Sequence, residues 1–177
     1  MMLESVSKLL FGATPNRRSV AVILMAALMG GIALCAAYAA DDALTAGVAV
    51  VVFVLAADLI GGCVANVSDS TNATYAAKPL RDRIVFLLAH AFHPALAVVA
   101  LGAPIVPFAA LYGYMLASGL IVLGVREASM QRQIAAALMA VGVVGWMLLD
   151  VPRLLLWFGP VYLFKLIYGF SVEHGRR

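Results

Sequence analysis

Six apolar stretches, each long enough to cross a lipid bilayer, dominate this chain of 177 residues. They cover residues 19–40, 43–66, 84–101, 105–125, 133–150 and 153–170. An α-helix rises 1.5 Å per residue, so about 20 apolar residues cross the ~30 Å hydrocarbon core of a membrane. The pattern predicts an all-α, polytopic integral membrane protein, a bundle of six transmembrane helices arranged as three hairpins.

The composition agrees with a membrane fold. Hydrophobic residues make up 64% of the chain and charged residues only 12%, whereas a soluble domain has about 25% charged residues. Six spans with their loops use nearly the whole length and leave no room for a separate soluble catalytic domain. We expect a cytoplasmic amphipathic segment at 1–18, a transmembrane domain at 19–170 and a basic cytoplasmic tail at 171–177.

Two parts of this segmentation have alternatives. Pro152 lies between the last two apolar stretches with only Asp150 and Arg153 beside it, so residues 133–170 form either two spans or one long, kinked element. The small residues of "AYAAD" at 37–41 would suit a signal-peptide cleavage site. The first apolar stretch is longer than the usual signal core of about 7 to 15 residues, which favours a retained span.

The segment before the first span has an amphipathic pattern. In "MMLESVSKLLFG" the apolar side chains fall on one face of a helix and the charged ones on another, namely Leu3, Val6, Leu9 and Leu10 against Glu4 and Lys8. Such a pattern predicts a short helix that lies on the membrane surface.

The basic residues fall into alternate loops of the six-span arrangement. With the amino terminus inside, ten lie on the cytoplasmic side (Lys8, Arg17, Arg18, Lys78, Arg81, Arg83, Arg126, Arg132, Arg176 and Arg177), and Arg153 alone lies on the other. Cytoplasmic loops concentrate Lys and Arg in this way. The bias predicts a protein of the bacterial inner (plasma) membrane with both termini in the cytoplasm.

The same bias accounts for the positive charge without nucleic acid as a partner. Positive cytoplasmic loops meet anionic lipid head groups, so the predicted partners are the bilayer and these head groups. The small size of the chain favours a homo-oligomer or membership of a larger membrane complex. No Gly-rich phosphate loop and no CxxC pair is present in the sequence, so the sequence identifies no cofactor.

A polar group interrupts the second and third spans. His90 and His93 share one face of the third span, and Asp58 lies at a similar depth, roughly 12 Å, in the second. Asn66 lies two helical turns after Asp58 on the same face. Because the two spans form a hairpin, the sequence predicts contact between Asp58 and a histidine. The tentative substrate or proton site is therefore Asp58, His90, His93 and Asn66.

Two neighbouring features add to this site. Pro94 lacks an N–H, so the carbonyl of His90 should lose its helical partner and become a free acceptor. The stretch from Asn66 to Tyr75 is rich in hydrogen-bonding side chains and predicts either an ordered vestibule or a solvated loop.

Three hypotheses for the polar group remain open. It serves proton-linked transport of a small solute, because histidine exchanges protons near neutral pH and ionisable residues within membranes usually mark function. Alternatively, it belongs to an enzyme at the inner leaflet, with Asp58, His90 and His93 as metal ligands or as a base and its orienting acid. In the third hypothesis the chain is a structural or accessory subunit, and an Asp–His hydrogen bond only fixes helix packing.

Four further residues have simpler interpretations. Lys165 lies near the cytoplasmic end of the sixth span and is expected to extend its ammonium to the membrane surface. His174, in the tail, is expected to be solvated. Cys35 and Cys63 lie at opposite depths of the bundle, too far apart for a disulfide.

Overall fold

A computed structural model describes residues 10–41 and 43–175, and every regular element within them is helical. The predicted surface helix at the amino terminus lies almost entirely outside the described residues. The elements are α2 (Arg17–Ala40), α3 (Ala46–Val67), α4 (Asp69–Ala76), α5 (Leu80–Ala89), α6 (Phe92–Leu101), α7 (Ile105–Gly124), α8 (Ala128–Met147), the 3-10 turn η1 (Arg153–Leu155), α9 (Phe158–Leu163) and the π-helix η2 (Phe164–Phe170).

Five of the described helical segments are long and apolar enough to cross a membrane: Arg17–Ala40, Ala46–Val67, Leu80–Leu101, Ile105–Gly124 and Arg153–Phe170. The prediction of an all-α membrane protein is confirmed at this level. Helix α8 has 20 residues, but Gln131, Arg132 and Gln133 near its start shorten its apolar part. Its assignment as a span is taken up with the proposed function.

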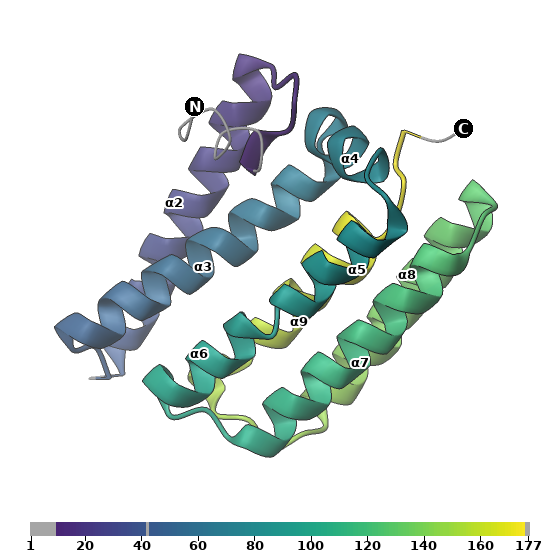
Figure 1. Ribbon diagram of the computed structural model, residues 1–177. Coiled ribbons are helices and arrows are strands. Elements are labelled where there is room, and N and C mark those ends of the chain that lie inside the picture. The colour runs from purple at the N-terminus through teal and green to yellow at the C-terminus, as the bar shows by residue number, and fades with distance from the viewer. Residues whose placement is uncertain (1–9, 42, 176–177) are drawn as a thin grey trace.

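Successive long elements run in opposite directions (Figure 1). The start of α2, the short helix α4, the α7–α8 turn and the carboxyl terminus gather at one end of the bundle. We call this end the basic end, because these segments contain Arg17, Arg18, Lys78 and Arg126. The α2–α3 turn, the α6–α7 turn and η1 lie at the opposite end, which we call the far end.

The chain between residues 133 and 170 forms two separate elements. Helix α8 ends at Met147, and α9 begins at Phe158 after an irregular stretch with Pro152. Both α9 and η2 pack back against α8. The alternative of one long, kinked element is therefore wrong, because proline and the polar residues around it turn the chain back on itself.

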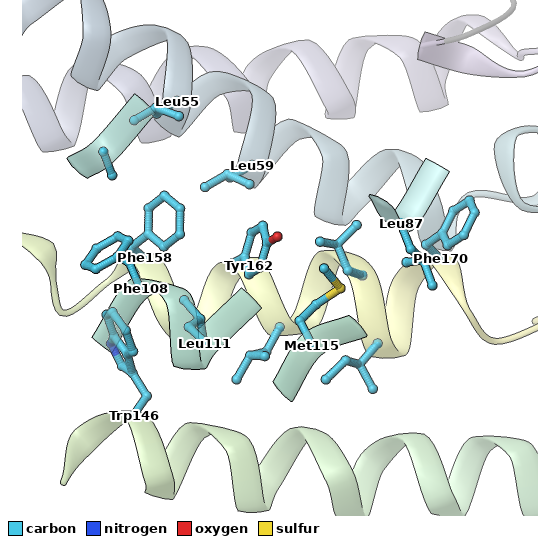
Figure 2. Packing of buried hydrophobic residues seen from close by; sticks show 14 of the residues in the cluster. Leu55, Leu59, Leu87, Phe108, Leu111, Met115, Trp146, Phe158, Tyr162 and Phe170 are labelled. Atoms are coloured by element: carbon cyan, nitrogen blue, oxygen red, sulfur yellow. The ribbon is translucent and has the colours of Figure 1, made fainter. Parts of the chain in front are cut away.

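The last helical segment, α9 followed by η2, forms the centre of the bundle. It contacts α3, α7 and α8, and η2 also contacts α4. Figure 2 shows this segment between α3 on one side and α8 on the other. Its fully buried side chains include Phe158, Tyr162, Leu163, Leu166 and Ile167. By contrast, α2 packs chiefly on α3 and leaves a broad apolar face exposed, as a helix in contact with lipid does.

The polar stretch after α3 is ordered, and the tail packs against it. Residues 69–76 form helix α4, in which Asn72 is buried. Its Nδ2 donates to the Val172 carbonyl at 2.8 Å, and its Oδ1 accepts from the His174 backbone N–H at 2.9 Å. The expected solvation of His174 is therefore wrong, because these hydrogen bonds hold the backbone of the tail against α4, and the partly buried ring lies 3.1 Å through Nε2 from the Tyr168 carbonyl.

Candidate functional site

Three ionisable side chains from three separate elements meet inside the bundle. Oδ2 of Asp58, on α3, lies 2.5 Å from Nε2 of His93, on α6. The same oxygen accepts from Nζ of Lys165, on η2, at 2.5 Å, and Nζ also donates to the Asp58 carbonyl at 3.2 Å. The predicted contact between Asp58 and a histidine is present. We call these three residues the charged cluster.

Local sequence features make room for the lysine. Gly62 follows Asp58 by one helical turn, and a Cβ at this position would collide with Cε of Lys165. Asn66, one turn further, donates from Nδ2 to the Lys165 carbonyl at 2.9 Å. Glycine and asparagine on α3 thus let the side chain pass and hold the π-helical backbone that carries it. Short π-helical stretches often occur at functional sites.

The members of the charged cluster differ in exposure. The Lys165 side chain is 5% exposed, that of His93 is 12% exposed, and that of Asp58 is 44% exposed. Both donors use Oδ2 of Asp58, and Oδ1 accepts no hydrogen bond from the described part of the chain. A buried ammonium needs its counter-charge, because an uncompensated ion costs several kcal/mol. Within the cluster, Oδ2 of Asp58 is therefore held by two partners, whereas Oδ1 is left without one.

His90 has a different role from the one predicted. Its Nδ1 lies 2.7 Å from the Phe86 carbonyl, and its ring stacks 5.0 Å from the His93 ring, so it does not bond to Asp58. The helix is interrupted between α5 and α6, and Pro94 supplies no N–H to the His90 carbonyl, as predicted. The prediction that this carbonyl becomes free is wrong, because it accepts from the His93 backbone N–H at 3.3 Å and from the Tyr162 hydroxyl at 2.9 Å.

One ring nitrogen of His93 is buried without a hydrogen-bond partner. Nδ1 is buried and forms no hydrogen bond within residues 10–41 and 43–175. When Nε2 donates its proton to Asp58, Nδ1 carries a lone pair that nothing satisfies. Such buried, unsatisfied groups cost about 1–3 kcal/mol and call for an explanation in native structures.

The metal-ligand hypothesis for Asp58, His90 and His93 is not supported by this geometry. Among the described residues, no three side chains of His, Cys, Asp or Glu are grouped closely enough to hold a metal ion. The ammonium of Lys165 occupies the place at Oδ2 that a cation would take, and Nδ1 of His90 faces a carbonyl.

A cavity of about 510 Å³ lies beside the charged cluster. Its walls come from the segment before α2 and from α2, α3, α4, α5, α6 and η2, with mostly apolar side chains and a polar group formed by Asp58, Asn66, Tyr75, His90, His93 and Lys165. Burial raises the pKa of Tyr75, on α4, to about 12, so its phenol stays neutral.

The cavity occupies only the half of the bundle nearest the basic end. Its α2 residues are Ile23, Leu24 and Ala27, from the first half of that helix, and its α3 residues run from Ala57 to Asn66, in the second half. Three large apolar lining residues are well exposed: Leu10 at 46%, Leu24 at 48% and Phe92 at 63%. Leu24 and Phe92 form an apolar rim between α2 and α6, so we expect the cavity to open sideways toward lipid.

Sequence reasoning missed Lys165. It is buried and paired with Asp58 rather than extended to the surface. A lysine and an aspartate at comparable depth in two apolar spans are the usual signal for such a pair, because neither charge is stable alone in hydrocarbon. Reading the two depths together would have predicted the contact.

The two cysteines take no part in the cluster. Both are free thiols, as expected. Sγ of Cys63 donates to the Val161 carbonyl at 3.4 Å, and Sγ of Cys35 donates to the Ala49 carbonyl at 3.6 Å. Each therefore acts as a small side chain that packs against a neighbouring backbone.

The chain matches no protein-family model, no curated protein sequence and no solved structure. Its function is therefore argued from the site.

Proposed function

We propose that this protein binds an amphiphilic molecule within the membrane and holds its polar head beside the charged cluster. The observation that carries the proposal is the position of the cavity, which opens toward lipid between α2 and α6 and contains the charged cluster. An apolar pocket with a few convergent polar groups is the usual form of a small-molecule site.

The shape of the cavity fits an amphiphile better than a freely dissolved solute. Its rim is apolar and exposed at Leu24 and Phe92, so a hydrocarbon chain leaving the cavity would stay in contact with lipid. Its polar side chains lie mainly on α3, α6 and η2. A head group bound beside them would not be in contact with the lipid hydrocarbon. Burying that head requires partners, which the cluster and its neighbours supply.

The charged cluster offers hydrogen-bonding partners to a polar head without a net charge. Asp58 and Lys165 together carry no net charge, and Nε2 of His93 lies 2.5 Å from the carboxylate oxygen that Lys165 also contacts. The other oxygen of Asp58 has no donor among the described residues and is available to a head group.

The membrane arrangement is part of the proposal. Helix α8 serves as a sixth span beside the five apolar segments, which gives three hairpins. The amino and carboxyl termini face the cytoplasm of a bacterial cell, because Arg17, Lys78 and Arg126 all belong to the basic end. The cavity then opens in the inner leaflet, where anionic head groups surround the basic residues. We also keep the expectation of a homo-oligomer or a larger membrane complex.

Proton-linked transport of a small solute is the second candidate. Its supporting observation is the interrupted backbone at the site, where the helix breaks after Ala89 and η2 is a π-helix. Discontinuous helices of this kind form substrate and ion sites in many transporters. Transport requires a second conformation that opens the cavity to the far end, because its present lining stops at the middle of the helices.

Two other hypotheses make less use of the site. An enzyme at the inner leaflet would use His93 as a base oriented by Asp58, and the one-sided cavity would hold its substrate. A purely structural Asp–His pair would not need a cavity beside it. An enzyme would convert a bound amphiphile into a product, whereas the proposed binding protein would hold it unchanged. A purely structural pair would bind no amphiphile.

Photo-crosslinking tests the proposal. The purified protein in nanodiscs is labelled with a mixture of single-chain diazirine amphiphiles that have hydroxyl, ammonium and phosphate heads, and labelled peptides are identified by mass spectrometry. We expect saturable labelling of α2 and α6 at the cavity rim. Ala89→Trp, an exposed rim position, should abolish it, whereas Ala110→Trp, an exposed position on α7 outside this cavity, should not. Uniform labelling that Ala89→Trp leaves unchanged would overturn the proposal.

A further inference from the structure

The polar atoms that the cavity leaves unpaired are mainly acceptors. Oδ1 of Asp58 has no donor among the described residues. Nδ2 of Asn66 is used by the Lys165 carbonyl, whereas Oδ1 of Asn66 receives no hydrogen bond from the described chain. Both residues line the cavity, and the Asn66 amide oxygen is not among the sealed polar atoms.

His90 contributes a third acceptor. Nδ1 faces the Phe86 carbonyl, which only accepts, so Nδ1 carries the proton. In the neutral ring Nε2 then has a lone pair. It has no donor within the described residues and is not sealed from the cavity that His90 lines. Of the donors nearby, Lys165 uses two of its three N–H groups on Asp58, and Nε2 of His93 lies against the same carboxylate.

The charges do not favour an ionic head. Lys165 cancels Asp58, so a phosphate finds no net positive charge and meets an unpaired carboxylate oxygen. An ammonium finds that oxygen but also lies near the buried ammonium of Lys165. Neither ion recovers the free energy of its hydration in an apolar cavity. A neutral head can donate one hydrogen bond to these acceptors from each of its O–H groups, and it brings no charge into the membrane.

From these contacts we propose that the ligand is a neutral, hydroxyl-headed amphiphile, a long-chain alcohol or an acylglycerol-like molecule, whose O–H groups donate to acceptors among Asp58 Oδ1, Asn66 Oδ1 and His90 Nε2. This inference rests on the proposed binding function and names the chemical class of its ligand. A site built to accept from a hydroxyl discriminates strongly against an analogue that lacks it, because its buried acceptors are then left unpaired.

The test compares four diazirine probes with the same hydrocarbon chain and different heads: alcohol, methyl ether, phosphate monoester and trimethylammonium. We expect half-saturation by the alcohol at a concentration about tenfold lower than by any of the others. The ether is the sharpest comparison, because it keeps the oxygen and removes only the donor. Equal labelling by alcohol and ether, or preference for the phosphate or the ammonium, would overturn this inference while leaving amphiphile binding intact.

The variant His90→Phe tests the same hydrogen bond by removing the acceptor from the protein instead of the donor from the probe. Phenylalanine keeps the ring contacts with Phe86 and His93 and removes Nε2, so the preference for alcohol over ether should fall about threefold or more. An unchanged preference would exclude His90 as an acceptor and contradict the three-acceptor site. If no probe labels the cavity of the wild-type protein at all, the proposed binding function itself fails. The wild-type comparison does not depend on how this variant folds.

Discussion

The two halves of the bundle are built on different principles. At the far end, Phe108, Trp146 and Phe158 pack ring against ring, with centroids 5.0 to 5.2 Å apart. At the basic end, the same central segment carries Lys165, and the bundle leaves a cavity beside the charged cluster. Figure 2 shows the first arrangement, in which the labelled rings fill the space between α3, α7, α8 and α9.

This difference indicates that the far end contributes more to stability and that the basic end is the better candidate for function. Close packing of large rings supplies many van der Waals contacts, which are the main attraction between helices in lipid. A cavity gives up such contacts, and buried charges add a desolvation cost. The half of the bundle that bears both costs is therefore the half that we associate with function.

The largest effect is expected from breaking the far-end packing. Trp146→Ala removes a fully buried ring and its hydrogen bond from Nε1 to the Leu156 carbonyl at 2.9 Å. It should lower the free energy of unfolding by about 3 kcal/mol, because the cavity it leaves cannot be refilled. Thermal unfolding in detergent measures this loss. A change below about 1 kcal/mol would contradict the assignment of stability to this half.

A smaller loss is expected from breaking the charged cluster. Asp58→Asn leaves the Lys165 ammonium buried without its counter-charge, and we expect a loss of about 2 kcal/mol, below the value for a sealed pair because the Asp58 side chain is 44% exposed. Adding Lys165→Met should recover most of the loss.

A double-mutant cycle from chemical unfolding quantifies this coupling. The prediction requires that the double variant is more stable than Asp58→Asn alone. If the two losses simply add, the ion pair is not what holds Lys165 in place.

A third variant sharpens the comparison within the basic half. Gly62→Ala places a methyl group where Lys165 passes, so the flexible end of the lysine must move and its contact with Asp58 must weaken. We expect a loss of about 1 kcal/mol together with weaker probe labelling. Gly113→Ala, on α7, meets no atom within 4 Å and serves as the matched control. Equal effects of the two substitutions would mean that the fit of Gly62 to Lys165 is unimportant.

The smallest effect concerns the tail at the basic end. Burial lowers the pKa of His174, so the folded protein binds this proton less readily than the unfolded chain does. Stability is therefore full above the ordinary histidine pKa of about 6.5 and decreases as the pH falls below it.

Comparing His174→Gln with wild type isolates the contribution of this residue from that of the cluster histidines. The wild type should lose about 2 °C more in Tm between pH 7.5 and pH 5.5, a small value because the ring is only partly buried. A variant that loses as much Tm as the wild type would show that His174 does not contribute.

The sequence predicted the fold class well because hydropathy alone determines it. Long apolar stretches must form helices in lipid, since no other structure satisfies their backbone groups. Pro94 likewise predicted a disturbed helix at His90, because a missing N–H has the same local consequence in any helix. It did not predict that the His93 N–H and the Tyr162 hydroxyl would both donate to the His90 carbonyl. For the stretch after α3 the sequence left an ordered and a solvated alternative open, and the structure shows an ordered helix, α4. The solvated tail expected at His174 was wrong, because the tail packs against α4.

The site was predicted only in part, for a physical reason. Asp58 and His93 belong to neighbouring spans, so a hairpin brings them together with little ambiguity. Lys165 lies 107 residues from Asp58 along the chain, and its contact depends on the last segment entering the centre of the bundle. Helix periodicity carries no information about which helix occupies that centre. The cavity likewise depends on how α2 and α6 are placed, which no single stretch of sequence specifies.

The most direct test of the account is a high-resolution density map of the protein in lipid nanodiscs. We expect elongated, chain-shaped density that enters between α2 and α6 and ends beside Asp58 and His90, with Lys165 in contact with Asp58. A cavity filled by the protein's own side chains, or a continuous water path from the charged cluster to the far end, would contradict a one-sided amphiphile site.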